Sequence, residues 1–215
     1  MHIMFTKQNT PTRAQLRPLL KALCLAAVFV QAPLALAEYK GENPMQESRE
    51  AAAAMLKELG GKLQAALKDG GPVNAVSVCT VEAPAIAQRI SDEEKITIRR
   101  VSAKPRNPTL GVPNDWQTKA MQQFEEALAR GDKPADMEFV EAVKAGSGSR
   151  MELRFAKPIV MQPQCTTCHG TPEQISPEVQ AKLKELYPND KATGYKPGEL
   201  RGAIVVNRYI GYNIN

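Results

Sequence analysis

Apolar positions in the first part of the chain repeat with the spacing of helices. Residues 45–68 are rich in Ala, Leu, Glu and Lys, and their apolar side chains recur three or four positions apart, at Met55, Leu56, Leu59, Leu63, Ala66 and Leu67. This periodicity predicts an amphipathic helix that Asn43-Pro44 can begin. We expect Gly60-Gly61 to weaken or break it, and Gly70-Gly71-Pro72 to stop and restart the chain.

The next stretch is mostly small and apolar, and then alternates. Residues 72–90 predict two helical pieces bent near Pro84, although the first is rich enough in valine to form a strand instead. Alternation over 96–101 predicts a strand, followed by an extended basic loop over 102–108. Asn114 can cap a helix over 115–130 that Gly131 closes.

The second half of the chain reads mainly as strands. Segments 137–145 and 151–159 predict a hairpin that turns at Gly146-Ser147-Gly148-Ser149, and 202–210 predicts a final strand. Ser176-Pro177 begins a helix that ends near Tyr187. The order of elements predicts an α+β fold, with N-terminal helices followed by a mainly antiparallel sheet.

One motif carries recognisable chemistry. Cys165-Thr166-Thr167-Cys168-His169 has the C-x-x-C-H spacing that attaches a c-type haem: both thiols form thioethers, and the histidine is the proximal iron ligand. A zinc site is the first alternative, and it would need Cys79 as a fourth ligand. A thioredoxin-like pair is the second, but it would begin a helix, whereas Pro163 and Gly170-Thr171-Pro172 predict a loop. The motif therefore predicts one covalent haem c.

Residues 1–37 have the features of a secretory signal peptide. Four basic residues and no acidic ones precede an apolar run from Ala22 to about Val30, and Ala35-Leu36-Ala37 is a small-x-small cleavage pattern. We expect export to the periplasm, cleavage after Ala37, and a mature domain of residues 38–215. The apolar run is short for a membrane span, so an uncleaved anchor is the alternative, and no membrane association is expected after cleavage.

The basic character of the whole sequence belongs mostly to this leader. The chain has a formal charge of +5, with 28 basic and 23 acidic residues, and removing the leader's four basic residues leaves +1. A nearly neutral mature chain gives no reason to expect nucleic acid or anionic lipid as a partner. Its length suffices for one buried core, and its three remaining cysteines do not form a disulfide framework.

The second axial ligand of the expected haem is constrained by counting. His169 is the only histidine after the leader, so one chain cannot supply two histidine ligands, and no Met, Cys or His follows it. The remaining protein ligands are Cys79, a lysine, a tyrosine or an upstream methionine, namely Met45, Met55, Met121, Met137, Met151 or Met161. Water or an open position would also serve. Cys79 lies among valines, so the residues alone leave it as a ligand or an inert core thiol.

Several stretches, in order, resemble the Tll-type haem-domain family, first described in cyanobacteria. The stretches are Val76–Cys79 with Ala83–Ala87, Arg99–Ser102 with Arg106–Pro108, Asp115-Trp116, Cys165–Gly170, and Gly194-Tyr195 with Arg201–Ala203. The resemblance implies a PAS-like fold related to haem-based redox or gas sensors. Carried over by motif, it also implies that Cys79 and His169 are the two iron ligands.

The basic loop and the strand before it offer contacts for haem propionates. Arg99, Arg100, Lys104 and Arg106 are the candidates, because guanidinium groups match carboxylates geometrically. The alternative is a solvated surface loop.

Together these features predict a redox- or gas-responsive haem module in which Cys79 is a thiolate ligand that lowers the redox potential. A diatomic gas is an expected ligand, and a periplasmic redox partner or signalling protein is the expected partner. The alternative is a periplasmic electron-transfer cytochrome with no sensing role. We do not expect an enzyme, because no second histidine remains as a distal acid–base group.

Overall fold

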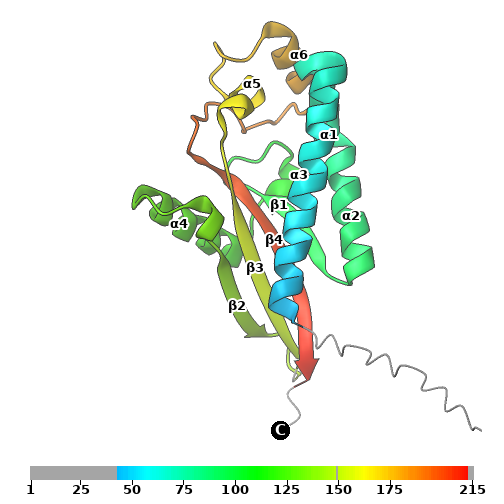
Figure 1. Cartoon of the computed structure of the whole chain (residues 1–215), viewed down its shortest axis with the longest axis vertical. Coiled ribbons are helices and arrows are strands. Elements are labelled where there is room, and N and C mark those ends of the chain that lie inside the picture. Colours follow the sequence, from blue (N-terminus) through cyan, green and yellow to red (C-terminus); the bar gives the residue numbers. More distant parts are fainter. Residues whose placement is uncertain (1–42, 149, 213–215) are drawn as a thin grey trace, which may run out of the picture. The chain divides into compact units, whose positions relative to one another are not determined.

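A four-stranded antiparallel sheet lies at the centre of the fold, with strand order β1-β4-β3-β2 (Figure 1). The computed structural model describes residues 43–148 and 150–212, all within one compact unit. The strands are β1 (Thr97–Val101), β2 (Phe139–Lys144), β3 (Arg150–Val160) and β4 (Leu200–Tyr212). The expected leader and its cleavage site lie outside the described residues. Within those residues, no helix combines the length and apolar composition needed to cross a membrane.

The first helix, α1 (Pro44–Thr80), runs from the predicted helix at 45–68 through a kink at Gly70-Gly71 into the valine-rich segment. Asn43 caps it by accepting a hydrogen bond from the Gln46 amide at 3.0 Å. The expected break at Gly60-Gly61 is wrong, because the backbone stays helical there although each glycine costs about 1 kcal/mol; strong helix formers such as Leu, Lys, Glu, Gln and Ala flank the pair. The restart at Gly70-Gly71-Pro72 is confirmed, since Gly71 has φ 69° and ψ −166°.

The second interruption lies at Val81, where α2 (Glu82–Glu94) begins. The bend expected near Pro84 therefore comes three residues earlier, and Pro84 falls in the first turn of α2, where a missing amide hydrogen has no helical partner to lose. The strand alternative for the valine-rich segment is wrong, because that segment is the last part of α1.

Helices cover both faces of the sheet. On one face, α4 (Asp115–Ala129) packs Trp116, Phe124 and their neighbours against Val101, Ala203 and Val205. On the other face, α1 and α2 pack their apolar residues against the strands (Ala51, Ala52, Met55, Ile86 and Ile90 against Ile98, Phe155, Ile204 and Val206). Successive residues of a strand therefore face different helices. This three-layer arrangement confirms the α+β prediction.

The remaining predicted elements are confirmed within a few residues. They are the strand at 96–101, the hairpin strands, the final strand, the helix at 115–130 with its Asn114 cap, and the helix α6 (Pro177–Leu186). The loop after β1 also contains a short helix, α3 (Pro108–Gly111), whose first amides donate to the Asn107 side chain at 2.9 and 3.2 Å.

The segment that carries the cysteine motif is helical, not a loop as predicted. A 3-10 turn, η2 (Pro163–Cys165), leads directly into the one-turn helix α5 (Thr166–His169). The Gly170 amide closes the turn by donating to the Thr166 carbonyl at 2.8 Å. Helical residues three positions apart share a face, so this conformation places Cys165 and Cys168 on the same side.

Candidate functional site

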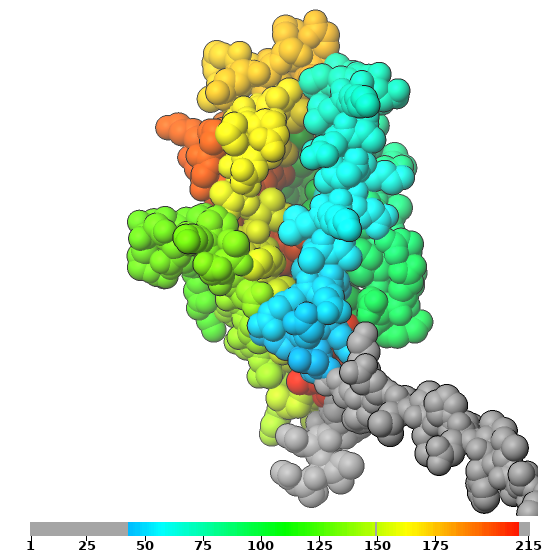
Figure 2. Space-filling model, viewed as in Figure 1, coloured from blue at the N-terminus to red at the C-terminus, as the bar shows by residue number. Residues whose placement is uncertain are grey.

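A cavity of about 250 Å³ lies between α1, the sheet and the cysteine motif. Figure 2 shows this face, with α1 in cyan beside the yellow segment that holds the end of β3 and α5. The cavity walls are largely apolar, formed by Leu56, Leu59, Leu63, Leu67, Val76, Ile159, Val160 and Met161. Cys79, Cys165, Cys168 and His169 line the same cavity. The fold thus brings the C-x-x-C-H motif and the distant Cys79 to one hollow.

One ring nitrogen of His169 is hydrogen-bonded to the backbone, and the other has no hydrogen bond within the described part of the chain. Its Nδ1 lies 2.7 Å from the carbonyl oxygen of Ala192, and because a carbonyl only accepts, Nδ1 donates. Burial, together with the positive charges of Arg106 and Arg201, holds the pKa of His169 well below its usual value. The imidazole is therefore neutral, and its Nε2 carries a lone pair, which is the form that binds metals.

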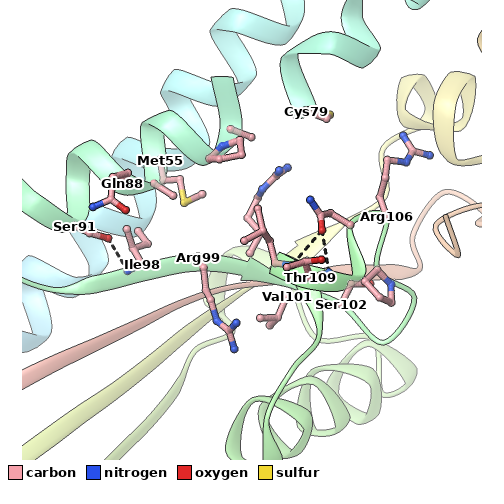
Figure 3. A pocket seen from close by; sticks show the side chains of 18 of the residues that line it. Met55, Cys79, Gln88, Ser91, Ile98, Arg99, Val101, Ser102, Arg106 and Thr109 are labelled. Atoms are coloured by element: carbon pink, nitrogen blue, oxygen red, sulfur yellow. Dashed lines mark hydrogen bonds between the residues drawn. The ribbon is translucent and has the colours of Figure 1, made fainter. Parts of the chain in front are cut away.

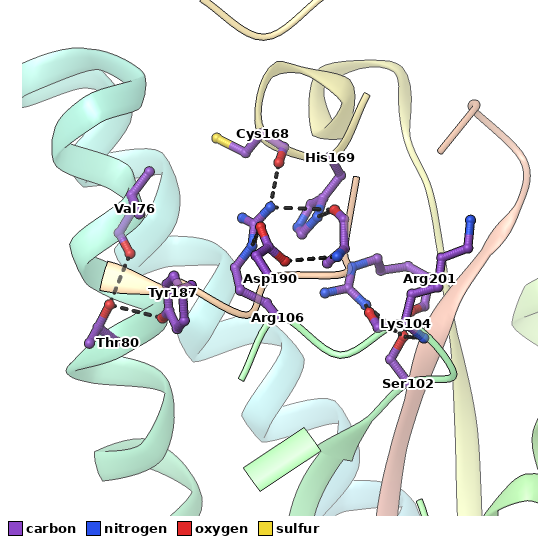
Figure 4. A network of polar contacts seen from close by, with 11 residues as sticks. Val76, Thr80, Ser102, Lys104, Arg106, Cys168, His169, Tyr187, Asp190 and Arg201 are labelled. Atoms are coloured by element: carbon purple, nitrogen blue, oxygen red, sulfur yellow. Dashed lines mark hydrogen bonds and ion pairs between the residues drawn. The ribbon is translucent and has the colours of Figure 1, made fainter. Parts of the chain in front are cut away.

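A buried ion pair fixes the segment around His169 (Figure 4). Arg106 Nε lies 3.1 Å from Asp190 Oδ2, and the two side chains are only 7% and 10% exposed. The same guanidinium donates to the carbonyl of Cys168, and Asp190 Oδ1 accepts from the Ala192 amide at 2.7 Å. Arg106 and Asp190 thereby set the Ala192 carbonyl that orients His169.

Backbone hydrogen bonds complete the support of the motif. The Gly194 amide donates to the Gly170 carbonyl at 2.7 Å, and the Tyr195 amide donates to the His169 carbonyl at 2.9 Å. Gly194 has φ 77°, a conformation that favours glycine, so the turn requires this residue. The Tyr195 ring meets the His169 ring edge-on, with centroids 6.4 Å apart.

Cys79 lies half-buried in the last turn of α1, on a different wall of the cavity from the motif. Both Cys79 and Cys168 pack against an apolar cluster from the ends of α1 and α6 (Val76, Ile175, Val179, Leu183 and Tyr187). Burial raises the pKa of the Cys168 thiol. Of the upstream methionines, Met161 lines the cavity and is 2% exposed. Iron ligation by Cys79 stays a prediction.

The four predicted cationic contacts separate in space. Arg100 lines the cavity, as does Arg106, which is already paired with Asp190. Arg99 donates to Gln117 Oε1 at 2.7 Å, toward α4 on the opposite face of the sheet. Lys104 Nζ lies 4.9 Å from the centre of the Tyr195 ring and is exposed.

Sequence reasoning missed Arg201, which lies at the start of β4 and lines the cavity. Its Nη1 donates to Ser102 Oγ at 2.8 Å, and its guanidinium lies 5.4 Å from the centre of the Tyr195 ring. Its Nε is buried and has no hydrogen-bond partner in the described part of the chain, and burial lowers the pKa of Arg201. The signal was present, because Arg201–Ala203 is one of the stretches that carry the family resemblance.

Asp190, Ala192 and Tyr195 also escaped prediction as site residues, because their roles depend on contacts distant in sequence. Ala192 acts through its carbonyl, which no sequence pattern marks.

The geometry also bears on the zinc alternative. Among the described residues, no group of three or more His, Cys, Asp or Glu side chains is placed to hold a metal ion. Cys79, Cys165, Cys168 and His169 line one cavity, and a structural zinc ion would need all four in a closed tetrahedron.

Comparisons with known proteins agree with the fold. A family model described as Tll0287-like matches residues 9–208. Among solved structures, the crystal structure of the cyanobacterial haem protein Tll0287 is similar, with a TM-score of 0.56 and 20% sequence identity. The match covers 79% of this chain and 94% of that chain, and it supports the predicted PAS-like fold. A search of the curated proteins finds no match.

Proposed function

The chain belongs to the Tll0287-like family, and from this premise we propose that it is an exported protein that carries one covalent haem c in the 250 Å³ cavity. One observation carries the proposal: Cys165, Cys168 and His169 line the same cavity as Cys79, although Cys79 is nearly ninety positions away. The composition of residues 1–37 supports export to the periplasm.

The residues around the cavity suit this cofactor. Cys165 and Cys168 are free thiols on one side of a helical turn, as two thioether bonds require. His169 presents an unprotonated Nε2, and we propose Cys79 as the second iron ligand. The unpartnered Nε of Arg201 is suited to a propionate, because a buried guanidinium without an acceptor is costly. Haem bound here would supply one-electron redox chemistry and, at an open axial position, gas binding.

We propose a redox- or gas-responsive role, for which the location of Cys79 is the main support. Cys79 is two residues before the helix break at Val81, whose side chain is 64% exposed. Next to it, the Thr80 hydroxyl lies 2.8 Å from the Tyr187 hydroxyl at the end of α6. A change in the position of Cys79 would therefore act on the junction of α1, α2 and α6, where a periplasmic redox or signalling partner could detect it.

The alternative function is electron transfer without sensing. The Arg106–Asp190 pair favours it, because a proximal histidine held by buried hydrogen bonds stays fixed during electron transfer. We propose no enzymatic role in either case, since His169 would serve as an iron ligand and no second histidine lies among the described residues.

Mass spectrometry of the periplasmic protein tests the cofactor assignment. The intact mass should equal the chain from Glu38 plus one haem, and Cys165→Ala with Cys168→Ala should abolish covalent attachment. Electronic spectra of the oxidised and reduced forms, with and without CO, then separate the two roles: a CO-binding reduced state supports sensing, and an unchanged six-coordinate state supports electron transfer. A zinc-containing, haem-free protein from a host competent in cytochrome c maturation would contradict the proposal.

A further inference from the structure

A second cavity, of about 350 Å³, lies between α2, β1 and the loop that contains α3 (Figure 3). It shares Cys79, Arg100, Val101 and Arg106 with the first cavity, and its other walls are different. Its volume is at the lower end of the range for small-molecule pockets, about 300–1,000 Å³. None of the haem-attachment residues Cys165, Cys168 and His169 lines this second cavity.

The lining of this second cavity has an unbalanced charge. Three arginines, Arg99, Arg100 and Arg106, line it, and the described lining contains no Asp or Glu. Arg99 is engaged with Gln117, and Arg106 is engaged with Asp190. Arg100 makes no hydrogen bond or ion pair within the part of the chain that the structure describes. One positive charge is therefore left without a partner.

The alternation of β1 shows which side Arg100 faces. Ile98 packs with Met55 and the rest of the α1–α2 cluster, whereas Val101 packs with the α4 cluster. Neighbouring residues of a strand point to opposite faces, so Arg100 shares the Ile98 side and Arg99 shares the Val101 side. Figure 3 agrees, with the Arg99 side chain on the other side of β1 from Cys79 and Met55.

The rest of the lining on the Arg100 side is mainly apolar. It includes Met55, Ala83, Pro84, Ala87, Ile98 and Leu110. One unpartnered guanidinium matches one negative charge, and the apolar walls match an uncharged, water-avoiding body. We propose that the second cavity binds a small organic monocarboxylate, with its carboxylate on Arg100 and its apolar body against α2 and Ile98.

Occupancy of this site would also affect Cys79, which lies on the wall between the two cavities. This step rests on the proposed function, because it takes Cys79 as an iron ligand. Binding of the carboxylate beside Cys79 would then change the redox potential of the iron. By linkage, a change in the redox state of the iron would change the affinity for the carboxylate by the same factor.

Titration of the haem-loaded protein with benzoate, followed by calorimetry, tests the binding site. We expect saturable binding with one site per chain. Arg100→Gln should weaken the binding at least about ten-fold, because it removes the charge-assisted hydrogen bonds to the carboxylate. Arg99→Gln is the matched control: Arg99 also lines the cavity, but its guanidinium donates to Gln117 on the opposite face, so the variant should leave the affinity nearly unchanged. Ala87→Phe should block the cavity and abolish binding without changing the charge.

The absence of saturable benzoate binding would overturn the inference. Equal losses in Arg99→Gln and Arg100→Gln would also overturn it, because they would indicate general attraction of anions. Inorganic phosphate binding as tightly as benzoate would also contradict it, because phosphate lacks the apolar body. Haem content and the visible spectrum, recorded for each variant, separate this result from the proposed function. A haem-free protein that binds benzoate contradicts only the cofactor assignment, and benzoate binding with no spectral change contradicts only the link through Cys79.

Discussion

The two faces of the sheet use the same strands but differ in how their helices fill them. On the α4 face, aromatic and small side chains pack closely: Phe124 is 2% exposed, Ala120 is fully buried, and the rings of Trp116 and Phe139 stack with centroids 6.0 Å apart. On the α1–α2 face, the apolar cluster ends before Cys79, and two cavities with arginines on their walls follow.

This difference indicates a division of labour between the faces. Close packing supplies stability, whereas a ligand site needs space and a few polar groups aimed into it. Substitutions at the residues that support the proposed site are therefore expected to change spectra and binding more than stability. Substitutions in the core under α4 are expected to change stability more than spectra or binding. Three substitutions, ordered by their effect on the free energy of unfolding, test this separation.

The largest loss of stability is expected from Phe124→Ala. Removing this buried ring should lower the free energy of unfolding by about 3–5 kcal/mol, through lost burial and the cavity that remains. Urea unfolding measures the loss, and the visible spectrum of the folded fraction should not change. Glu125→Ala, at an exposed position of the same helix, is the control and should stay within about 0.5 kcal/mol. A clear spectral change in Phe124→Ala would show that the two faces are not separable.

An intermediate loss is expected from Asp190→Asn. The substitution leaves the Arg106 charge, 7% exposed, without its carboxylate, and should cost about 2–3 kcal/mol because the amide still accepts a hydrogen bond. It should also alter the spectrum, because Asp190 holds the Ala192 segment that orients His169. Asp132→Asn removes an exposed ion pair with Arg130 and should cost about 0.5 kcal/mol or less. Equal losses in the two variants would mean that the buried pair does not support the site.

Whether a feature of the two faces could be predicted from the sequence depends on how far apart in the sequence the interacting residues are. Local signals sufficed for the caps at Asn43 and Asn114 and for the strand at 96–101, because neighbouring residues decide them. They overstated the effect of Gly60-Gly61, where the backbone of α1 stays helical. They failed again at Cys165–His169, where Pro163 begins the helical segment and Gly170 ends it, so both residues mark its ends and not a loop.

The site shows the same limit. The C-x-x-C-H spacing marked three lining residues directly, and the family resemblance added Cys79. The four predicted cations were treated as equivalent, although the alternation of the predicted strand already placed Arg99 and Arg100 on opposite faces. Arg201 and Asp190 could not be assigned, because Arg201 contacts Ser102 across 99 positions, and Asp190 meets Arg106 across 84 positions.

The smallest loss of stability, and the sharpest contrast with Phe124, is expected from Cys79→Ala. The thiol is half-buried, so its removal should cost about 1 kcal/mol or less, similar to deleting one methyl group. If Cys79 is the second iron ligand, the variant should nevertheless lose thiolate-type spectral features and gain a higher redox potential, since a thiolate stabilises ferric iron. Covalent attachment should persist, because Cys165 and Cys168 are untouched. Ser77→Ala, in the same turn of α1, is the control and should keep the wild-type spectrum.

An unchanged spectrum and potential in Cys79→Ala would make Cys79 a packing residue. The second ligand would then be an upstream methionine, with Met161 the methionine that lines the cavity, or the position would be open. With a methionine ligand, electron transfer would displace sensing as the better-supported function, whereas an open position would support gas binding.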